Sequence, residues 1–321
     1  MGSLFSSVSS WPLGGELTCL LAALCWSSAV TLLGPVIERL GAQAVNLFKN
    51  VLTLVLLGLT LLLVGGWSEL TAASWQSLAL IFASGLLGLA LGDTALLAAV
   101  PRLGVHRTLL WQTTGPIFAA ILAFALYGDL PTLLDGLGAA VVLLGVWVVV
   151  SDRPSAAAPR ESATEASAAG SRSATSSLVA IGTVLAILAA FGQGAGVVVA
   201  KAGMADLGAI SATWVRLLAG ALGVAAALAI RGQLGSTVRS LASWREVKSL
   251  TPATLLGTYI GMVLMMAGIA ATHASVAAVL LATSPIFSLF IDARLEARRI
   301  PIRGLVGTVI AVVGVGVLAA G

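Results

Sequence analysis

Three ionisable residues lie inside long apolar stretches of the chain, where a charged side chain is costly to bury. Lys49 and Arg216 are the basic residues of this kind, and Asp93 is the acidic one. A charge at membrane depth usually faces a cavity or an oppositely charged partner. The Asp93 side chain is too short to reach an interface ~10 Å away, so it requires a partner or water. We expect Lys49, at a similar depth, to be that partner, and the pair to respond to a substrate or a proton.

Each of these charges also has a structural interpretation. The long side chains of Lys49 and Arg216 could extend to the membrane interface, which is called snorkelling. Asp93 could form a static ion pair or cap a broken helix. The functional interpretation places the two cationic groups near the two entrances of a cavity, where they attract a carboxylate or phosphate of the substrate. The sequence leaves both interpretations open.

Two prolines interrupt apolar stretches, each next to side chains that form hydrogen bonds. A proline removes a backbone donor and obstructs a helical turn, so we expect a kink near the middle of each helix, with free carbonyl groups. The functional interpretation is a hinge or a broken-helix site, because paired interruptions are the best sequence indication of a transport site. A fixed kink that shapes packing is the alternative. The prolines and their polar neighbours are Pro116 with Gln112, Thr113 and Thr114, and Pro285 with Ser284.

Aromatic and amide side chains on the same stretches complete the candidate substrate-binding and gating residues. Trp26 and Tyr259 could line a pocket, although aromatic residues of membrane proteins are more often interface anchors or packing groups. Gln193 could donate a hydrogen bond to a polar substrate, with a hydrogen bond between helices as the alternative.

The sequence lacks the motifs of common enzymes. It has no Walker A motif, so we do not expect ATP to drive the protein directly. No group of Cys, His, Asp and Glu residues has metal-ligand spacing, and Ser and His do not form a nucleophile–base pattern. No basic cluster is interleaved with aromatic residues, which argues against nucleic acid as a partner. We expect no enzymatic activity, no cofactor and no metal.

The composition indicates a polytopic membrane protein. Of the 321 residues, 59% are hydrophobic and only 9% are charged, whereas soluble domains have about 25% charged residues. A helix that spans a bilayer needs ~20 apolar residues, within a range of roughly 17–25. Ten stretches qualify as candidates, at 16–36, 43–64, 75–99, 106–127, 132–150, 178–200, 209–230, 253–271, 275–291 and 303–320.

The chain repeats itself. Segment 41–49, with its Gly-Ala pair and Lys49, has a counterpart at 208–216, at residue numbers 167 higher. Segment 114–118 has a counterpart at 283–287, at numbers 169 higher. Duplicated membrane units are characteristic of transporters.

The repeats divide the chain into parts. Between the two sets of five apolar stretches lies a segment rich in Ser and Ala that has no apolar run, which is typical of a disordered linker. We expect a tail at 1–13, a first five-helix repeat at 14–151, a linker at 152–177 and a second five-helix repeat at 178–321.

The charges support opposite orientations of the two repeats. Five helices per repeat force the second repeat to be inverted in the membrane. Of the 17 basic residues, 14 lie in the odd-numbered loops between the ten stretches. The positive-inside rule therefore places the odd loops in the cytoplasm and both termini outside. We expect a bacterial inner membrane.

These motifs resemble the drug/metabolite transporter superfamily, and within it the EamA-type members. Short patterns in the same order in both halves carry the resemblance, and Asp129 stands where the family pattern has Glu. The matching residues are 21–26, Lys49, Gly92 to Gly104, Thr114 to Pro116, Gly128, Asp129, Gly138 and Gly145 in the first half, and Arg216, Pro285, Glu296, Gly307 and Gly314 in the second.

The resemblance implies an all-α protein with ten transmembrane helices, in two inverted five-helix repeats around a central cavity. It implies a secondary transporter, for which we expect a small polar metabolite, an amino acid or related carboxylate, exported by alternating access with a proton as candidate counter-ion. Efflux of lipophilic cations is the alternative. A membrane-embedded enzyme or a non-transporting membrane partner is the alternative of another class. Besides the metabolite we expect membrane lipid as partner, and no oligomeric state follows.

Overall fold

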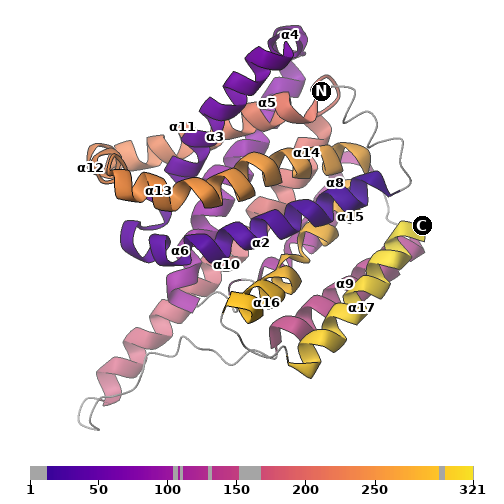
Figure 1. Cartoon of the computed structure of the whole chain (residues 1–321). Helices are drawn as coiled ribbons and strands as arrows, with labels where there is room; N and C mark the ends of the chain where they lie inside the picture. The colour runs from indigo at the N-terminus through magenta and orange to yellow at the C-terminus, as the bar shows by residue number, and fades with distance from the viewer. Residues whose placement is uncertain are drawn as a thin grey trace.

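The structure is a computed structural model in which the described residues form helices joined by short connections, with no strand among them (Figure 1). Within the described residues, six helical stretches are long and apolar enough to cross a membrane, and four shorter apolar helices accompany them. The all-α fold expected from the sequence is therefore confirmed. The described residues are 13–103, 108, 111–128, 132–151, 168–295 and 301–320.

Both halves of the chain contain a similar series of helices. In the first half these are α2 (Gly14–Leu40), α3 (Ala42–Val64), α4 (Trp67–Ala72), α5 (Trp75–Gly85) continued by η1 (Leu86–Asp93) and α6 (Thr94–Leu103), α8 (Gly115–Tyr127) and α9 (Leu133–Ser151). In the second half they are α10 (Ala168–Gly203), α11 (Ala209–Ile230), α12 (Leu234–Leu241), α13 (Trp244–Ala253) continued by η2 (Thr254–Ile260) and α14 (Gly261–Ala271), α15 (Ala274–Leu281), α16 (Ser284–Leu295) and α17 (Ile302–Ala320).

Equivalent elements begin at nearly constant separations. Helices α3 and α11 begin 167 residues apart, η1 and η2 begin 168 apart, and α8 and α16 begin 169 apart. Both η1 and η2 are π-helices, in which backbone hydrogen bonds run from residue i to i+5. The duplication seen in the sequence is therefore also a duplication of helices, and it includes a rare helix type.

The first helix of each half packs into the other half. Helix α10 contacts α5, η1, α6 and α8, and α2 contacts η2, α14, α15 and α16. The last helices of the two halves, α9 and α17, lie side by side (Figure 1). The centre of the molecule is therefore built from both halves.

Three helices extend beyond their expected ends. Helix α6 continues to Leu103, beyond the expected end of the stretch 75–99, and the Arg102 side chain donates to the Ala98 carbonyl at 2.5 Å. A basic side chain that satisfies a carbonyl near a helix end supports such a final turn. Helix α10 begins within the expected linker, at Ala168, and α13 begins at Trp244. Residues 1–12, 129–131, 152–167 and 296–300, which include Asp129 and Glu296, lie outside the described residues.

The two prolines lie at breaks between helices, as the broken-helix interpretation expects, and not at kinks within continuous helices. The chain turns at residues 113–114 and again at 282–283, and a new helix starts after each turn. Pro116 and Pro285 are the second residues of α8 and α16. A proline fits the first turn of a helix because its missing N–H would have no partner there. Each interruption is therefore a complete break between two helical segments.

Hydroxyl groups satisfy carbonyls at these breaks. Thr114 Oγ1 donates to the Trp111 carbonyl at 2.7 Å, and its counterpart Thr283 Oγ1 donates to the Leu280 carbonyl at 2.6 Å. Ser284 Oγ donates in the same way to the Leu281 carbonyl at 2.7 Å. Such bonds allow a broken helix at membrane depth. We expected free carbonyl groups here, but these three carbonyls accept hydrogen bonds.

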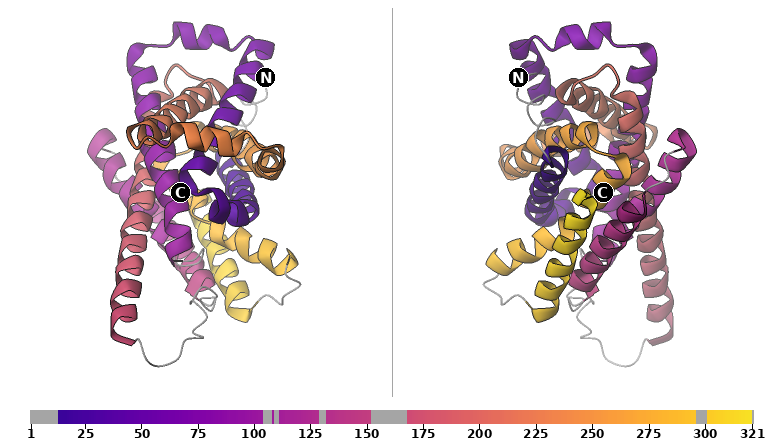
Figure 2. Two further views of the ribbon diagram at one scale, coloured as in Figure 1. Left: turned by 90° about the vertical axis from the view of Figure 1, so that its left-hand side faces the viewer. Right: turned by 90° about the vertical axis from the view of Figure 1, so that its right-hand side faces the viewer.

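Helix α4 lies at one end of the molecule, which we call the α4 end (Figure 2). Carboxylates near α4 join the two halves. Asp206, between α10 and α11, accepts hydrogen bonds from Ser74 Oγ at 2.6 Å and Ser77 Oγ at 2.9 Å. Glu69 of α4 accepts from Ser211 Oγ at 2.6 Å. Each carboxylate thus lies at the N-terminus of a helix from the other half, where negative charge is stabilising.

We expect Asp206→Asn to lower the melting temperature of the purified protein at pH 7 by a few degrees. Hydrogen bonds, chiefly from Ser74 and to a smaller extent from Ser77, hold the pKa of Asp206 below its ordinary value of 3.8. A carboxyl group whose pKa is lower in the folded state than in the unfolded state stabilises the fold at pH values above its unfolded-state pKa. This stabilisation is lost as the pH falls through the folded-state pKa. The difference between native and variant protein should therefore shrink below pH 3.8. Thermal unfolding from pH 3 to 8 checks this.

The matched control is Glu38→Gln, which neutralises an exposed carboxylate of α2. This control should unfold like the native protein at every pH. Equal melting temperatures of Asp206→Asn and native protein at pH 7 would contradict the capping role.

Candidate functional site

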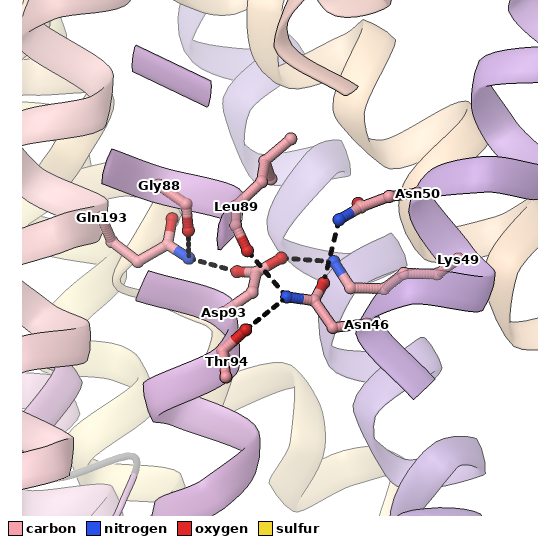
Figure 3. Close-up of polar contacts among 8 residues, drawn as sticks. All are labelled: Asn46, Lys49, Asn50, Gly88, Leu89, Asp93, Thr94 and Gln193. Atoms are coloured by element: carbon pink, nitrogen blue, oxygen red, sulfur yellow. Dashed lines mark hydrogen bonds and ion pairs between the residues drawn. The ribbon is translucent and has the colours of Figure 1, made fainter. Parts of the chain in front are cut away.

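Lys49 and Asp93 form a buried ion pair between Lys49 Nζ and Asp93 Oδ2 (Figure 3). Their side chains are 3% and 0% exposed, respectively. Lys49 lies on α3 and Asp93 is the last residue of η1, so the pair links two long helices of the first half. The expected pairing is confirmed, and Lys49 does not snorkel.

Asn46 holds α3 against η1 and α6 beside the ion pair, and Asn50 is bonded to Asn46 within α3 (Figure 3). Asn46 Nδ2 donates to the Leu89 carbonyl at 2.7 Å and to Thr94 Oγ1 at 2.8 Å. Asn50 Nδ2 donates to Asn46 Oδ1 at 3.2 Å. Residues 46, 49, 50 and 53 repeat at intervals of three or four, so helical geometry gathers their polar side chains on one face of α3.

Helix α10 supplies a third partner of the ion pair. Gln193 Nε2 donates to Asp93 Oδ1 and also to the Gly88 carbonyl, at 3.5 Å (Figure 3). The α10 backbone reaches η1 because Gly192 has no side chain, since a Cβ atom there would lie 2.6 Å from the Leu87 carbonyl oxygen. Both oxygens of the buried carboxylate therefore accept hydrogen bonds, and the donors come from both halves.

The ammonium group of Lys49 also lies over an indole ring. Its Nζ atom is 5.4 Å from the ring centroid of Trp26, on α2. A cation at this distance is attracted by the negative face of the ring. The site thus holds an ammonium group between a carboxylate and an aromatic face.

A cavity adjoins the ion pair and contains about 880 Å³ of free space, counting its open part. Among the described residues that line it, Asp93 is the one ionisable residue, and Trp26, Gln112, Gln193 and Ser284 carry the other polar side chains. Most of the remaining lining is apolar, which is typical of a pocket for a small molecule. The other lining residues are Ala22, Leu96, Gly115, Pro116, Gly194, Val197, Gly257, Gly261, Met262, Met265, Ala278, Leu281, Ala282 and Pro285.

The sequence candidates divide between the cavity and its surroundings. The candidates in the lining are Trp26, Asp93, Gln112, Pro116, Gln193, Ser284 and Pro285. Lys49 lies behind Asp93, and Thr113 and Thr114 form the turn before α8. The apolar residues of the lining were missed because an apolar residue toward a cavity has the same sequence pattern as one in a packed core.

Two lining residues add to the chemistry of the cavity. The Gln112 side-chain nitrogen Nε2 is buried and has no hydrogen-bond partner among the described residues, so it can donate to a ligand. Met262 is the counterpart of Asp93 in the second half, and both line the cavity. Equivalent positions thus carry a carboxylate and a thioether, so the cavity lining is electrostatically asymmetric.

Arg216 lies neither at the cavity nor at an interface, the two positions that the interpretations of its charge expect. It is 1% exposed and is neither in the described lining of the cavity nor extended to an interface. Its Nη1 atom donates to Ser84 Oγ at 2.5 Å and to the Gly196 carbonyl at 3.1 Å. Arg216 of α11 therefore binds α5 of the first half and α10 of its own half.

Tyr259 joins two helices away from the cavity lining. Its Oη atom lies 2.7 Å from Thr60 Oγ1, so η2 is hydrogen-bonded to α3. The side chain is partly buried, and its position favours the packing interpretation over the pocket interpretation.

Comparisons with known proteins agree with this architecture. The model of the EamA-like transporter family matches residues 13–151 and 180–320, one match in each half. No curated protein matches the chain. A solved structure described only as "Crystal structure of protein" has a TM-score of 0.69 and 14% sequence identity, and the match covers 96% of this chain and 98% of that chain. At this identity the likeness shows the fold alone. The two family matches cover most of the chain, which therefore belongs to the EamA-like transporter family.

Proposed function

We propose that this protein is a secondary transporter that moves a small zwitterionic metabolite, an amino acid or a close relative, through the cavity beside Asp93. The observation that carries the proposal is the Lys49–Asp93 ion pair at the edge of a cavity built from both halves. Transport as such is supported by the family, whose members are transporters of the drug/metabolite type.

The ion pair favours a substrate that carries both charges. A lone anion would bind Lys49 and leave Asp93 unpaired, and a lone cation would do the reverse. Leaving one member of a buried ion pair without its partner costs about 3–5 kcal/mol. A zwitterion supplies a carboxylate to Lys49 and an ammonium group to Asp93, so no buried charge is left alone. The face of Trp26 also favours an ammonium group.

The rest of the cavity suits the remainder of such a molecule. Gln112 offers an unpaired donor for a carboxylate oxygen. Met262 and Met265 supply flexible thioether side chains that adapt to an apolar substituent. A proton can replace the ammonium group, because a protonated Asp93 needs no counter-ion. Transport of simple carboxylates would then be coupled to proton movement.

The proposed arrangement in the membrane has ten spans in two inverted repeats. The six long apolar stretches and the four shorter apolar helices supply them. The basic loops favour a cytoplasmic position for the end opposite the α4 end, with both termini outside. Export across a bacterial inner membrane, through alternating access to the cavity, is the direction we propose.

Efflux of a lipophilic cation is the second candidate function. It is favoured by one observation, since the ionisable group in the described cavity lining is a carboxylate beside an indole ring. It requires Lys49 to leave Asp93 without a replacement partner, which makes it the weaker candidate.

Zwitterionic amino acids should raise the melting temperature of the detergent-purified protein, because a ligand that binds the folded state stabilises it by mass action. Lys49→Ala should lose this effect, since the substrate carboxylate loses its partner. Lys248→Ala is the matched control, because Lys248 also lies over a tryptophan ring, 5.1 Å from the centroid of Trp244, but lies outside the cavity lining. Stabilisation by lipophilic cations alone, retained in Lys49→Ala, would contradict the proposal and support cation efflux.

Asp93→Asn should remove the effect of a proton gradient on transport, because the amide has no carboxylate to protonate. We expect proteoliposomes with the native protein to accumulate the stabilising carboxylate at least about tenfold more with a gradient than without it, which corresponds to about 1.4 kcal/mol of coupling. The variant should show no such ratio. Asp135→Asn, at the start of α9, is the control with the same substitution outside the cavity lining. A gradient effect that persists in Asp93→Asn would exclude Asp93 as the coupling group.

A further inference from the structure

Arg216 carries a buried charge without a carboxylate partner among the described residues. Neither of the two ion pairs found in this part of the chain includes it. Its Nη1 atom is bound by neutral groups, Ser84 Oγ and the Gly196 carbonyl. Its Nε atom is buried and has no hydrogen-bond partner within the described ranges. A buried cation that lacks a counter-ion is strongly unfavourable, so this arrangement suits a group that gains a partner in another state.

A continuous series of contacts leads from Arg216 to Asp93. A Cβ atom at Gly88 would lie 2.9 Å from Arg216 Nη2, so the guanidinium lies directly against this glycine. The Gly88 carbonyl accepts a hydrogen bond from Gln193 Nε2, which also donates to Asp93 (Figure 3). Gly88 and Gln193 thus connect the unpaired cation to the buried carboxylate. The absence of a side chain at residue 88 leaves room for the guanidinium to move along η1.

The helix that connects the two charged groups is of a type that can change its winding. Ser84 lies on α5, and η1 then runs from Leu86 to Asp93. π-helical segments are rare and are frequent at functional sites. A change of η1 toward α-helical winding would rotate Asp93 relative to Ser84, because the two helix types turn by different angles per residue. The same segment can therefore present Asp93 to different partners.

The inverted repeat identifies Asp93 as the partner of Arg216. Lys49 and Arg216 are equivalent residues of the two halves, and in alternating access one half rocks against the other around a fixed site. By that symmetry Arg216 should acquire the kind of partner that Lys49 has here. The counterpart of Asp93 in its own half is Met262, which cannot pair with a cation. Asp93 is the carboxylate that the contact series provides.

We propose that Arg216 is the second counter-ion of Asp93, and that it pairs with Asp93 in the state that is open at the α4 end. The pairing displaces the ammonium group of the substrate from Asp93, and so promotes release. It also breaks the hydrogen bonds by which Arg216 of α11 now holds Ser84 of α5 and Gly196 of α10. Ser84 lies nine residues, and Gly196 seven residues, from the α4 end of its helix. This inference rests on the proposed function, but its test in the substrate-free protein does not need a substrate.

The experiment measures access to the cavity from the α4 end. Ala278→Cys, at a lining residue of α15, supplies a reporter thiol after the two native cysteines are removed by Cys19→Ala and Cys25→Ala. A membrane-impermeant thiol reagent is added from the α4 side of oriented vesicles. We expect Arg216→Gln to lower the labelling rate about tenfold, because the open state loses an ion pair. Arg216→Lys should restore part of the rate, since its ammonium group can still pair with Asp93.

Two further variants keep the charge of Arg216. Ser84→Ala removes a neutral partner that holds Arg216 in the present state, so labelling should become faster. Gly88→Ala places a methyl group 2.9 Å from the present position of Arg216 Nη2, so the guanidinium must shift out of that position and labelling should also become faster. If Arg216→Gln does not fold, these two variants decide the question. Labelling rates equal to those of the native protein in all variants, or slower labelling in Ser84→Ala or Gly88→Ala, would overturn the inference.

The result is separable from the proposed function. If no amino acid or carboxylate stabilises the native protein while the labelling rates change as expected, the substrate assignment fails and the exchange of Asp93 partners stands. If a ligand stabilises the protein but the labelling rates do not change, the transport proposal stands and Arg216 has only a structural role.

Discussion

The buried ion pair of Lys49 and Asp93 constrains everything around it. Two charges removed from water are tolerated only when their remaining hydrogen-bonding positions are also filled. Gln193 fills the second oxygen of the carboxylate, and the face of Trp26 contacts the ammonium group. These partners come from four helical segments and from both halves of the chain. The polar centre therefore ties the two repeats together, as the carboxylates Glu69 and Asp206 do at the α4 end.

Short polar side chains can meet at this centre only because the helices approach closely. Gly192 allows the backbones of α10 and η1 to touch, and Gly257 and Gly261 do the same for the η2–α14 segment against α2. Larger residues at these positions would push the helices apart and separate the partners of the ion pair. Small residues commonly serve this purpose in membrane proteins, where close packing contributes much of the association energy.

The sequence was sufficient for the features that depend on depth and repetition. Asp93 could be paired with Lys49 because both lie at similar depth in adjacent helices, and a short carboxylate has few alternatives at that depth. Pro116 and Pro285 located the helical interruptions, but the sequence did not decide between a full break and a fixed kink. The hydroxyls of Thr114 and Thr283, which satisfy carbonyls at the breaks, could not be placed from the sequence. The position of Arg216 could not be predicted, because depth does not determine which neighbouring helix a side chain faces.

The duplication gives the backbone a symmetry that the charges do not share. Equivalent positions hold Lys49 and Arg216, but Asp93 is matched by Met262, so two cations correspond to one carboxylate. Whichever cation lacks the carboxylate must be bound by neutral groups, as Arg216 is by Ser84 and Gly196. The two states of such a molecule differ in energy even without substrate, because a lysine and an arginine hold the carboxylate with different geometry. A symmetric fold with one shared acid is thus biased toward one of its two orientations, and a zwitterion or a proton at Asp93 can change that bias.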